Sequence, residues 1–284
     1  MAFKTLVDAE TLERHLADPT FALVDCRFML DDEGWGLRAY MESRVPGSCF
    51  ADVDRDLSGQ KTGTNGRHPL PDPSALVDTF GRLGIDRATQ VVAYDQGGGM
   101  YASRLWWLLR WMDHSAVAVL DGGFANWQSE RRRVESGAPP PGRPARVFVG
   151  GPQPGMIVDA IDVARLIGDP RWRLLDARAP ERYRGDVEPI DRVPGHIPGA
   201  RSRPFASNLN ERGMFLPART LRDQLQQVIA GAEPAHVVSY CGSGVTACHN
   251  LLAIEHAGLS GAKLYPGSWS EWSSDPDRPV ERGG

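Results

Sequence analysis

The chain repeats itself, and this repetition limits its possible folds more than any other feature. Four segments of the first half recur in the same order in the second half: 6–9 with 157–160, 23–27 with 174–178, 91–95 with 237–241, and 121–127 with 266–272. Regular self-similarity is the sequence signature of a repeated structural unit. We therefore expect two copies of one domain.

A segment rich in proline and glycine separates the two copies. Residues 137–155 contain six prolines and five glycines, in a chain of 284 residues. Proline blocks helix formation and glycine loosens the backbone, so this composition indicates a linker or an extended crossing segment. The sequence predicts a domain over residues 1–136, a linker over 137–155 and a second domain over 156–284.

Both copies follow the same pattern of a short apolar run and then a helical segment. Residues 91–94 precede a helical pattern over 102–111, and residues 237–240 precede one over 246–257. Apolar runs without polar alternation are typical of strands covered on both faces, as in parallel sheets. We predict an α/β fold in which each domain is a parallel sheet with helices on both faces.

Composition excludes several classes of protein. The net charge is −4, which does not match the basic surface of a nucleic-acid-binding protein, so no nucleic-acid partner is expected. No apolar stretch reaches the length of about 18 residues that a membrane span needs, and the N-terminus does not resemble a signal peptide. The four cysteines form no C-x-x-C pair, so we expect reduced thiols and a cytoplasmic location.

One cysteine follows an apolar strand in a position typical of a nucleophile. Cys241 comes directly after residues 236–240, and Gly242 and Gly244 allow the next residues to curl so that backbone N–H groups converge. Thr246 then begins a helix, whose N-terminus adds positive potential. A sulfur in this position would be held as the nucleophilic thiolate. The alternative is an inert buried cysteine beside a packing turn.

The matching loop of the first half carries an acidic residue in place of the cysteine. Asp95 stands before Gly97, Gly98 and Gly99, and a carboxylate cannot perform thiol chemistry. The sequence predicts one catalytic domain and one degenerate domain.

Other chemistry is disfavoured by spacing. A cysteine phosphatase needs an arginine six residues after its nucleophile, and that position is Ala247. The residues nearest to a zinc pattern, Cys241, Cys248, His249 and His256, lack zinc-ligand spacing. No metal is expected.

Three motifs resemble those of the two-domain rhodanese-like sulfurtransferases: residues 195–200 (GHIPGA), 241–247 (CGSGVTA) and 264–272 (LYPGSWSEW). The loop 241–247 is similar to the active-site loop of 3-mercaptopyruvate sulfurtransferases. The resemblance implies that Cys241 takes a sulfane sulfur from a small anionic donor and passes the resulting persulfide sulfur to cyanide or a thiol. It implies no cofactor, and a thioredoxin-like reductant is a candidate partner.

The resemblance also implies roles for other residues. Arg182 would bind the donor, while the backbone of Gly242, Gly244, Val245 and Thr246 would hold the anionic group. The mercaptopyruvate enzymes carry a second binding arginine where this chain has Asp191. Arg192 could replace that arginine, and thiosulfate therefore stays open as the donor.

Three further residues match proposed proton-transfer positions of the family. Ser243 corresponds to the serine of the active loop, and His68 and Asp54 correspond to first-domain residues that reach the cleft between the halves. Each could instead have only a structural role.

Residues with a simpler structural interpretation are set apart from the site. We expect Asp176, Arg178 and His196 to hold strand ends and Cys248 to lie in the core. Trp269 and Trp272 could line the mouth of the pocket. The alternative for the whole chain is a non-catalytic rhodanese-like binding or regulatory protein.

Overall fold

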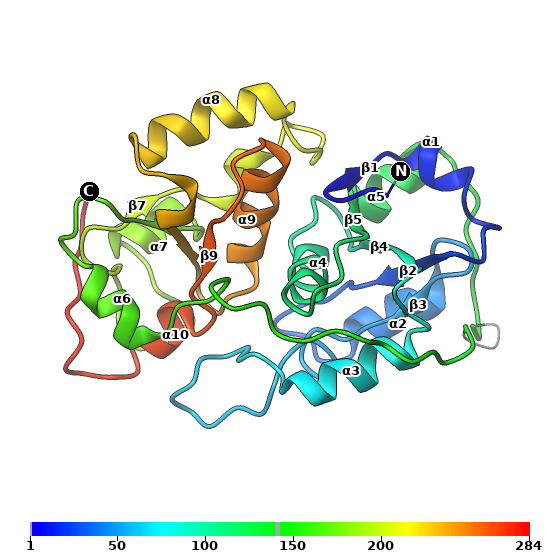
Figure 1. The fold of residues 1–284 in the computed structure, drawn as a ribbon, viewed down its shortest axis with the longest axis horizontal. Helices are drawn as coiled ribbons and strands as arrows, with labels where there is room; N and C mark the ends of the chain where they lie inside the picture. The colour runs from blue at the N-terminus through cyan, green and yellow to red at the C-terminus, as the bar shows by residue number, and fades with distance from the viewer. Residues whose placement is uncertain (1, 140–142) are drawn as a thin grey trace. The chain divides into compact units, whose positions relative to one another are not determined.

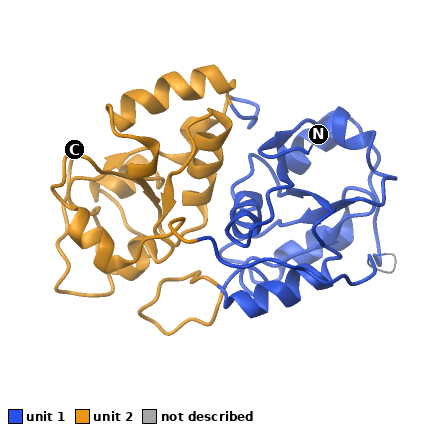
Figure 2. Ribbon diagram, in the orientation of Figure 1, with its two compact units in different colours: residues 1–58, 71–153, 211–215 blue, residues 59–70, 154–210, 216–284 orange. Residues whose placement is uncertain are grey.

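The computed structural model describes residues 2–139 and 143–284 (Figure 1). Residues 140–142 of the predicted linker lie outside the described residues. The chain folds as two compact units (Figure 2). The first unit holds residues 1–58, 71–153 and 211–215, and the second holds 59–70, 154–210 and 216–284. Each unit thus includes a short segment from the other half of the sequence. The domain boundaries at 136 and 156 were drawn from the sequence repeat alone, and they stay a prediction.

The first unit is built on a parallel sheet of five strands in the order β1-β5-β4-β2-β3. The strands are β1 Leu6–Val7, β2 Phe21–Asp25, β3 Cys49–Phe50, β4 Gln90–Tyr94 and β5 Val117–Leu120. The helices are α1 Ala9–Glu13, α2 Trp35–Glu42, α3 Pro73–Arg82, α4 Ala102–Trp111 and α5 Gly123–Ser129. Every residue of β2 and β4 is buried, because this part of the sheet is covered on both faces.

The second unit repeats this arrangement with four strands in the order β7-β6-β8-β9. The strands are β6 Arg173–Asp176, β7 Arg201–Ser202, β8 Val237–Tyr240 and β9 Lys263–Leu264. The helices are α6 Ala160–Leu166, α7 Pro180–Arg184, α8 Ala218–Ile229, α9 Thr246–His256 and α10 Ser268–Trp272, with 3₁₀ turns η1 Phe205–Asn208 and η2 Pro234–His236. A parallel bridge between Ile157 and Leu264 takes the place that β1 has in the first unit.

Corresponding strands therefore pair in the same way in both units. β4 lies between β2 and β5, as β8 lies between β6 and β9, and all of these pairs are parallel. The helix that follows each central strand packs back onto the sheet, α4 on β4 and β5 and α9 on β8 and β9. The predicted α/β fold with two related parallel sheets is confirmed.

The core of the second unit contains aromatic side chains that the sequence analysis placed elsewhere. Trp269 and Trp272 are completely buried and belong to the main hydrophobic cluster of this unit. Their indole N–H groups donate to Val193 O and Pro279 O, each at 2.9 Å. The prediction that they line a pocket mouth was wrong, because a buried indole needs only one polar partner and both find it inside the fold.

Cys248 is buried as expected. Its side chain has no exposed surface, and Sγ donates to the carbonyl oxygen of Gly244 at 3.3 Å. Cys248 is therefore a core residue of α9.

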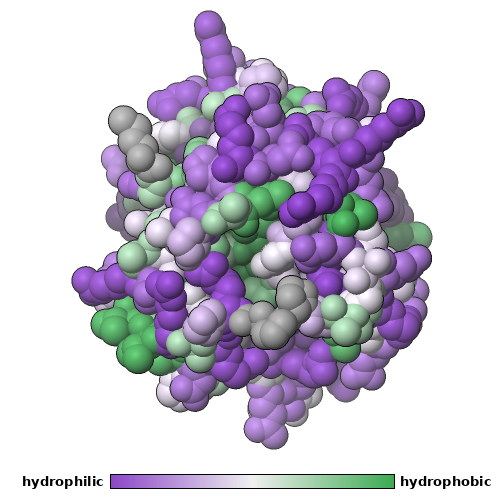
Figure 3. Space-filling model, turned by 90° about the vertical axis from the view of Figure 1, so that its right-hand side faces the viewer, coloured by the Kyte–Doolittle hydropathy of each residue, from purple (hydrophilic) through white to green (hydrophobic). Residues whose placement is uncertain are grey.

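The outer surface is mainly polar where it can be seen. One face is drawn in Figure 3, and its hydrophobic residues form small separate patches among hydrophilic ones. Within residues 2–139 and 143–284, no helix combines the length and the apolar character needed to cross a membrane.

Candidate active site

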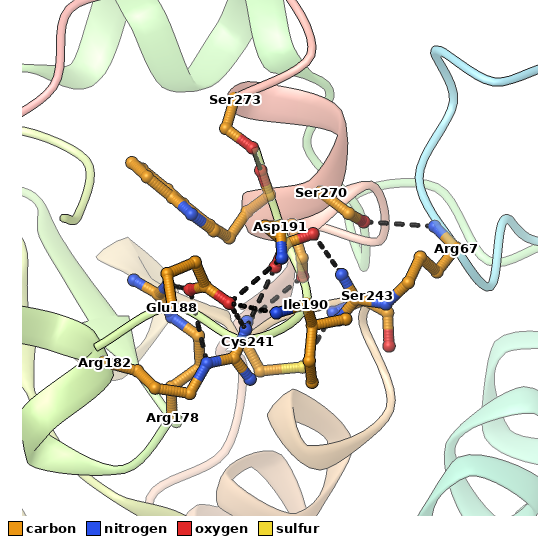
Figure 4. A network of polar contacts seen from close by, with 12 residues as sticks. Arg67, Arg178, Arg182, Glu188, Ile190, Asp191, Cys241, Ser243, Ser270 and Ser273 are labelled. Carbon is orange, nitrogen blue, oxygen red and sulfur yellow. Dashed lines mark hydrogen bonds and ion pairs between the residues drawn. The ribbon is translucent and has the colours of Figure 1, made fainter. Parts of the chain in front are cut away.

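Cys241 lies at the carboxyl end of β8, in a loop that surrounds its sulfur (Figure 4). Sγ accepts hydrogen bonds from the backbone N–H groups of Ser243 at 3.4 Å and Gly244 at 3.1 Å. Gly244 has a φ of +80°, and a Cβ at this position would lie 2.3 Å from the carbonyl oxygen of Pro266. Only glycine fits both requirements, so this residue shapes the loop that stabilises a negative charge on sulfur.

The segment at the start of α10 holds the loop from behind. The N–H of Cys241 donates to Ser268 Oγ at 3.1 Å, and Cys241 O accepts from the N–H of Trp269 at 2.9 Å. Ser268 has a φ of +54°, in the left-handed region, and its hydroxyl also donates to Tyr265 O. A non-glycine residue adopts this conformation only where its surroundings stabilise it. The motif at 264–272 therefore positions the nucleophile, a role of Ser268 that the sequence analysis missed.

His68 reaches this loop, as the sequence analysis expected. Residues 59–70 belong to the second unit, and His68 Nδ1 lies 2.7 Å from Ser243 Oγ. Both side chains are buried. The structure thus brings His68 and Ser243 together, while their part in proton transfer stays a prediction.

Asp54 belongs to the first unit, whereas the other predicted site residues belong to the second. It is half-buried, and its backbone N–H donates to Asp52 Oδ1 at 2.9 Å. Its proposed role in catalysis stays a prediction.

Arg182 lies beside the loop on α7. A Cβ built on Gly242 would lie 3.5 Å from Arg182 Nη1. Arg182 Nη2 pairs with Glu188 Oε1 at 2.6 Å and Asp191 Oδ2 at 3.0 Å (Figure 4). These contacts fix a guanidinium group next to the residue that follows the nucleophile.

The two carboxylates that hold Arg182 have opposite pKa shifts. Burial raises the pKa of Asp191, and its ion pairs with Arg67 and Arg182 only partly offset this effect. Burial also acts to raise the pKa of Glu188, but hydrogen bonds from Arg182 and from the N–H groups of Asp191 and Ile190 outweigh it, and the pKa is lowered. The hydrogen bonds that Glu188 accepts thus outweigh its burial, whereas the ion pairs of Asp191 do not.

Arg178 and Asp176 form the structural pair that the sequence predicts. Their side chains are almost completely buried and are joined at 2.6 Å. Arg178 also donates to Gly195 O at 2.7 Å and pairs with Glu188 at 3.2 Å. This pair links the end of β6 to the loop that carries Glu188.

His196 also has structural contacts. Its ring stacks on Tyr183 with a centroid distance of 3.8 Å, and Nδ1 lies 2.7 Å from Tyr183 O. The GHIPGA motif thus serves packing in this chain.

Arg192 lies at the edge of a cavity of about 240 Å³ within the second unit. The cavity is lined by the basic residues Lys61, Arg67 and Arg192, and by the hydroxyl groups of Ser270, Ser273 and Ser274. Arg192 is exposed, and its role in donor binding stays a prediction.

The sequence analysis also missed Arg67, and it named Asp191 only as the residue in place of an expected arginine. Arg67 directly precedes His68, and it forms an ion pair with Asp191. The N–H of Arg67 donates to Ser270 Oγ at 3.0 Å, which ties this segment to α10. The only sequence signals were the position of Arg67 beside His68 and an aspartate where an arginine was expected.

The matching loop of the first unit has a carboxylate at its centre. Asp95 accepts four hydrogen bonds from the N–H groups of Gly97, Gly99, Tyr101 and Ala102, at 2.7–3.1 Å. The side chain is completely buried, and burial raises its pKa against the effect of these four donors. This loop therefore surrounds an acidic side chain of the protein itself.

Comparison with known proteins agrees with this geometry. The model of the rhodanese-like domain matches residues 8–130 and 159–275. A Pseudomonas aeruginosa protein named "Probable 3-mercaptopyruvate sulfurtransferase" is 45% identical over 100% of both chains. The Arabidopsis thaliana "Thiosulfate/3-mercaptopyruvate sulfurtransferase 1, mitochondrial" is 30% identical over 97% of this chain and 78% of its own.

A solved structure supports the same relationship. The 3-mercaptopyruvate sulfurtransferase from Leishmania major superposes with a TM-score of 0.84 at 32% identity, over 95% of this chain and 74% of that one. The chain therefore belongs to the family of proteins with rhodanese-like domains. Its full-length relatives place it among the tandem-domain sulfurtransferases, the 3-mercaptopyruvate and thiosulfate enzymes of that family.

Proposed function

We propose that this sulfurtransferase works through a persulfide on Cys241. The thiolate attacks the transferable sulfur of the donor, and a new S–S bond forms on Sγ while the bond between sulfur and the rest of the donor breaks. Pyruvate leaves from 3-mercaptopyruvate after protonation of its enolate, and sulfite leaves from thiosulfate. A thiol or cyanide then attacks the outer sulfur and returns Cys241 to the thiolate.

The observation that carries this proposal is the loop around Cys241. Two N–H groups point at Sγ, and a persulfide anion needs the same donors as a thiolate. The arginine next to Gly242 matches a donor that carries a carboxylate or thiosulfonate group. The backbone groups of Gly242, Val245 and Thr246 are retained as proposed further members of this cradle.

Ser243 and His68 are proposed to move the proton that the reaction requires. Their side chains are 2.7 Å apart, and Ser243 is one of the two residues whose N–H contacts the sulfur. A hydroxyl hydrogen-bonded to an imidazole can deliver a proton to the leaving group and recover it later. Asp54 is retained as a proposed third member of this relay.

The catalytic reaction is assigned to the second domain, and the first is proposed to be degenerate. Cys241 is free, whereas the matching position of the first domain is Asp95. We propose 3-mercaptopyruvate as the preferred donor because the loop 241–247 resembles that of the mercaptopyruvate enzymes, with thiosulfate as the second donor.

Intact-mass measurement tests this function directly. After incubation with 3-mercaptopyruvate or thiosulfate, the wild-type chain should gain the mass of one sulfur atom. Cys241→Ser should gain none, and the matched control Cys248→Ser should load like the wild type, because Cys248 is a core residue. If neither donor loads sulfur onto the wild type, the chain is a rhodanese-like binding protein instead of an enzyme.

The proposed acceptor is a thiol, with a thioredoxin-like reductant as a candidate, or cyanide. A cytoplasmic location is proposed on the basis of the four free cysteines, since reduced thiols are typical of that compartment. Turnover with reduced thioredoxin and fractionation of the source cells test these two proposals.

A further inference from the structure

A second guanidinium group lies beside the nucleophile, and it comes from Arg67. A Cβ built on Gly242 would lie 2.6 Å from Arg67 Nη2 and 3.7 Å from Arg182 Nη2. The absence of a side chain at Gly242 therefore leaves room for two arginines next to Cys241. Arg67 is also part of the cavity lining and is about a quarter exposed, 24%, so a small molecule can reach it from solvent.

Both guanidinium groups have hydrogen-bond donors to spare. Arg67 Nε is buried and has no hydrogen-bond partner among the described residues. Arg67 uses Nη1 for its ion pair with Asp191, and Arg182 uses Nε and Nη2 for its carboxylate partners. A buried guanidinium N–H without a partner is unfavourable, and an anion placed there would remove this penalty.

Asp191 connects the two arginines. Its Oδ1 faces Arg67 Nη1, and its Oδ2 lies 3.0 Å from Arg182 Nη2, while only 5% of its side chain is exposed. Each oxygen of Asp191 thus contacts one arginine. A negatively charged carboxylate cannot itself bind an anion, but its two contacts fix the spacing and direction of the two guanidinium groups.

We propose that Arg67 is the second residue that binds the anionic donor, and that Asp191 is a positioning residue that holds Arg67 and Arg182 toward Gly242. The ligand is a small anion with at least two oxygens, such as a carboxylate or thiosulfonate, since two planar guanidinium groups can grip such a group from two sides. This inference rests on the proposed function and identifies how its donor is recognised. It assigns to Arg67 the role for which the sequence offered Arg192.

Steady-state kinetics with 3-mercaptopyruvate and with thiosulfate test the role of Arg67. Arg67→Gln should raise the donor KM about tenfold or more, because hydrogen bonds to a charged group are lost. The kcat should change much less. Arg67→Lys keeps the charge without the planar fork, so its donor KM should fall between those of the wild type and Arg67→Gln. The matched control Lys61→Gln removes a cation from the same cavity and should leave KM unchanged.

The acceptor step separates binding from a general structural effect. The KM for a neutral thiol such as 2-mercaptoethanol should be the same in Arg67→Gln and the wild type. A damaged loop would instead change the KM values of both the donor and the acceptor. Asp191→Asn should raise the donor KM, and its effect should be less than additive with that of Arg67→Gln because it acts through that residue. Strict additivity of the two would overturn the positioning role.

Two outcomes overturn the assignment of Arg67. One is an unchanged donor KM in Arg67→Gln, and the other is an equal rise in Lys61→Gln. The persulfide itself is tested separately, by the mass gained by the wild type at saturating donor, so the two proposals can fail independently. If the wild type loads sulfur and Arg67→Gln has the wild-type donor KM, the role of Arg67 is refuted while the proposed function stands.

Discussion

The two units place different side chains at the centre of the same kind of loop. In the first, the Asp95 carboxylate follows β4 and accepts four backbone N–H groups. In the second, the Cys241 sulfur follows β8 and accepts two. In both units the loop therefore directs backbone N–H groups at the side chain that follows the central strand, and the two units differ in which side chain that is.

The surroundings of the two loops differ as well. Arg27 pairs with Asp25 at 2.6 Å in the first unit, just as Arg178 pairs with Asp176 in the second. Among the described residues, only the second pair is extended, by Glu188, to an arginine beside the loop. The paired aspartate and arginine are shared between the two units, and the charged groups proposed to recognise a donor belong to the second.

The largest expected effect comes from making the second loop like the first. Cys241→Asp should lower sulfur transfer by at least about a thousandfold, because no thiolate remains to form the persulfide. The chain should nevertheless fold, since the cradle accommodates a carboxylate in the first unit. Activity with 3-mercaptopyruvate and a urea unfolding curve check both parts, and a Cys241→Asp variant with residual persulfide would contradict the comparison.

Removing the Asp95 side chain from the first loop should lower the free energy of unfolding, while the kcat of the folded protein should stay the same. Asp95→Ala leaves four buried N–H groups without their acceptor, and we expect a loss of about 3–5 kcal/mol in the free energy of unfolding. Asp95→Asn should lose less, about 1–3 kcal/mol, because one oxygen remains. Urea unfolding measures both, and equal stability of Asp95→Ala and the wild type would show that the cradle does not depend on its carboxylate.

The next largest effect concerns the hydroxyl group of Ser243, which the first loop lacks at the equivalent position. Ser243→Ala should lower kcat about ten- to a hundredfold if Ser243 and His68 transfer a proton. The equivalent residue of the first loop is Gly97, and Gly97→Ala serves as a control because a Cβ there has ordinary contacts, the nearest atom lying 3.6 Å away. Equal kcat values for both variants and the wild type would remove Ser243 from the reaction.

The smallest expected effect is a pH dependence that belongs to the second unit alone. The pKa of Glu188 is below its ordinary value of 4.5, so its charge stabilises the fold above that pH. This contribution is lost as the pH falls through the lowered pKa. Glu188→Gln should therefore flatten the fall in stability below pH 4.5. Urea unfolding at pH 6 and in this acidic range gives the difference, and parallel curves for variant and wild type would refute it.

Much of the fold could be predicted because its signals are local. The strand before Cys241, its two glycines and the helix after Thr246 are contiguous, and the repeat identifies the matching segments of the first unit. The pairing of Arg67 with Asp191 joins residues that are 124 positions apart, and no periodic pattern connects them. Long-range pairs of single charges depend on how the chain crosses between units, which the sequence does not display.

The indole side chains show a second limit. Trp269 and Trp272 follow the last strand of the second half, and this position suggested a place at the mouth of the pocket. Burial depends on the direction of each side chain, and α10 turns both indoles into the core. The left-handed conformation of Ser268 is likewise set by its contacts rather than by its residue type.

The segment 59–70 has a consequence for how such a protein can change over generations. A shortened gene that encodes only residues 156–284 would keep Cys241 and lose His68 and Arg67 together. Under the roles proposed for His68 and Arg67, selection for sulfur transfer also preserves the half of the gene that carries Asp95 at the cysteine position. The second copy then depends on a segment encoded within the first.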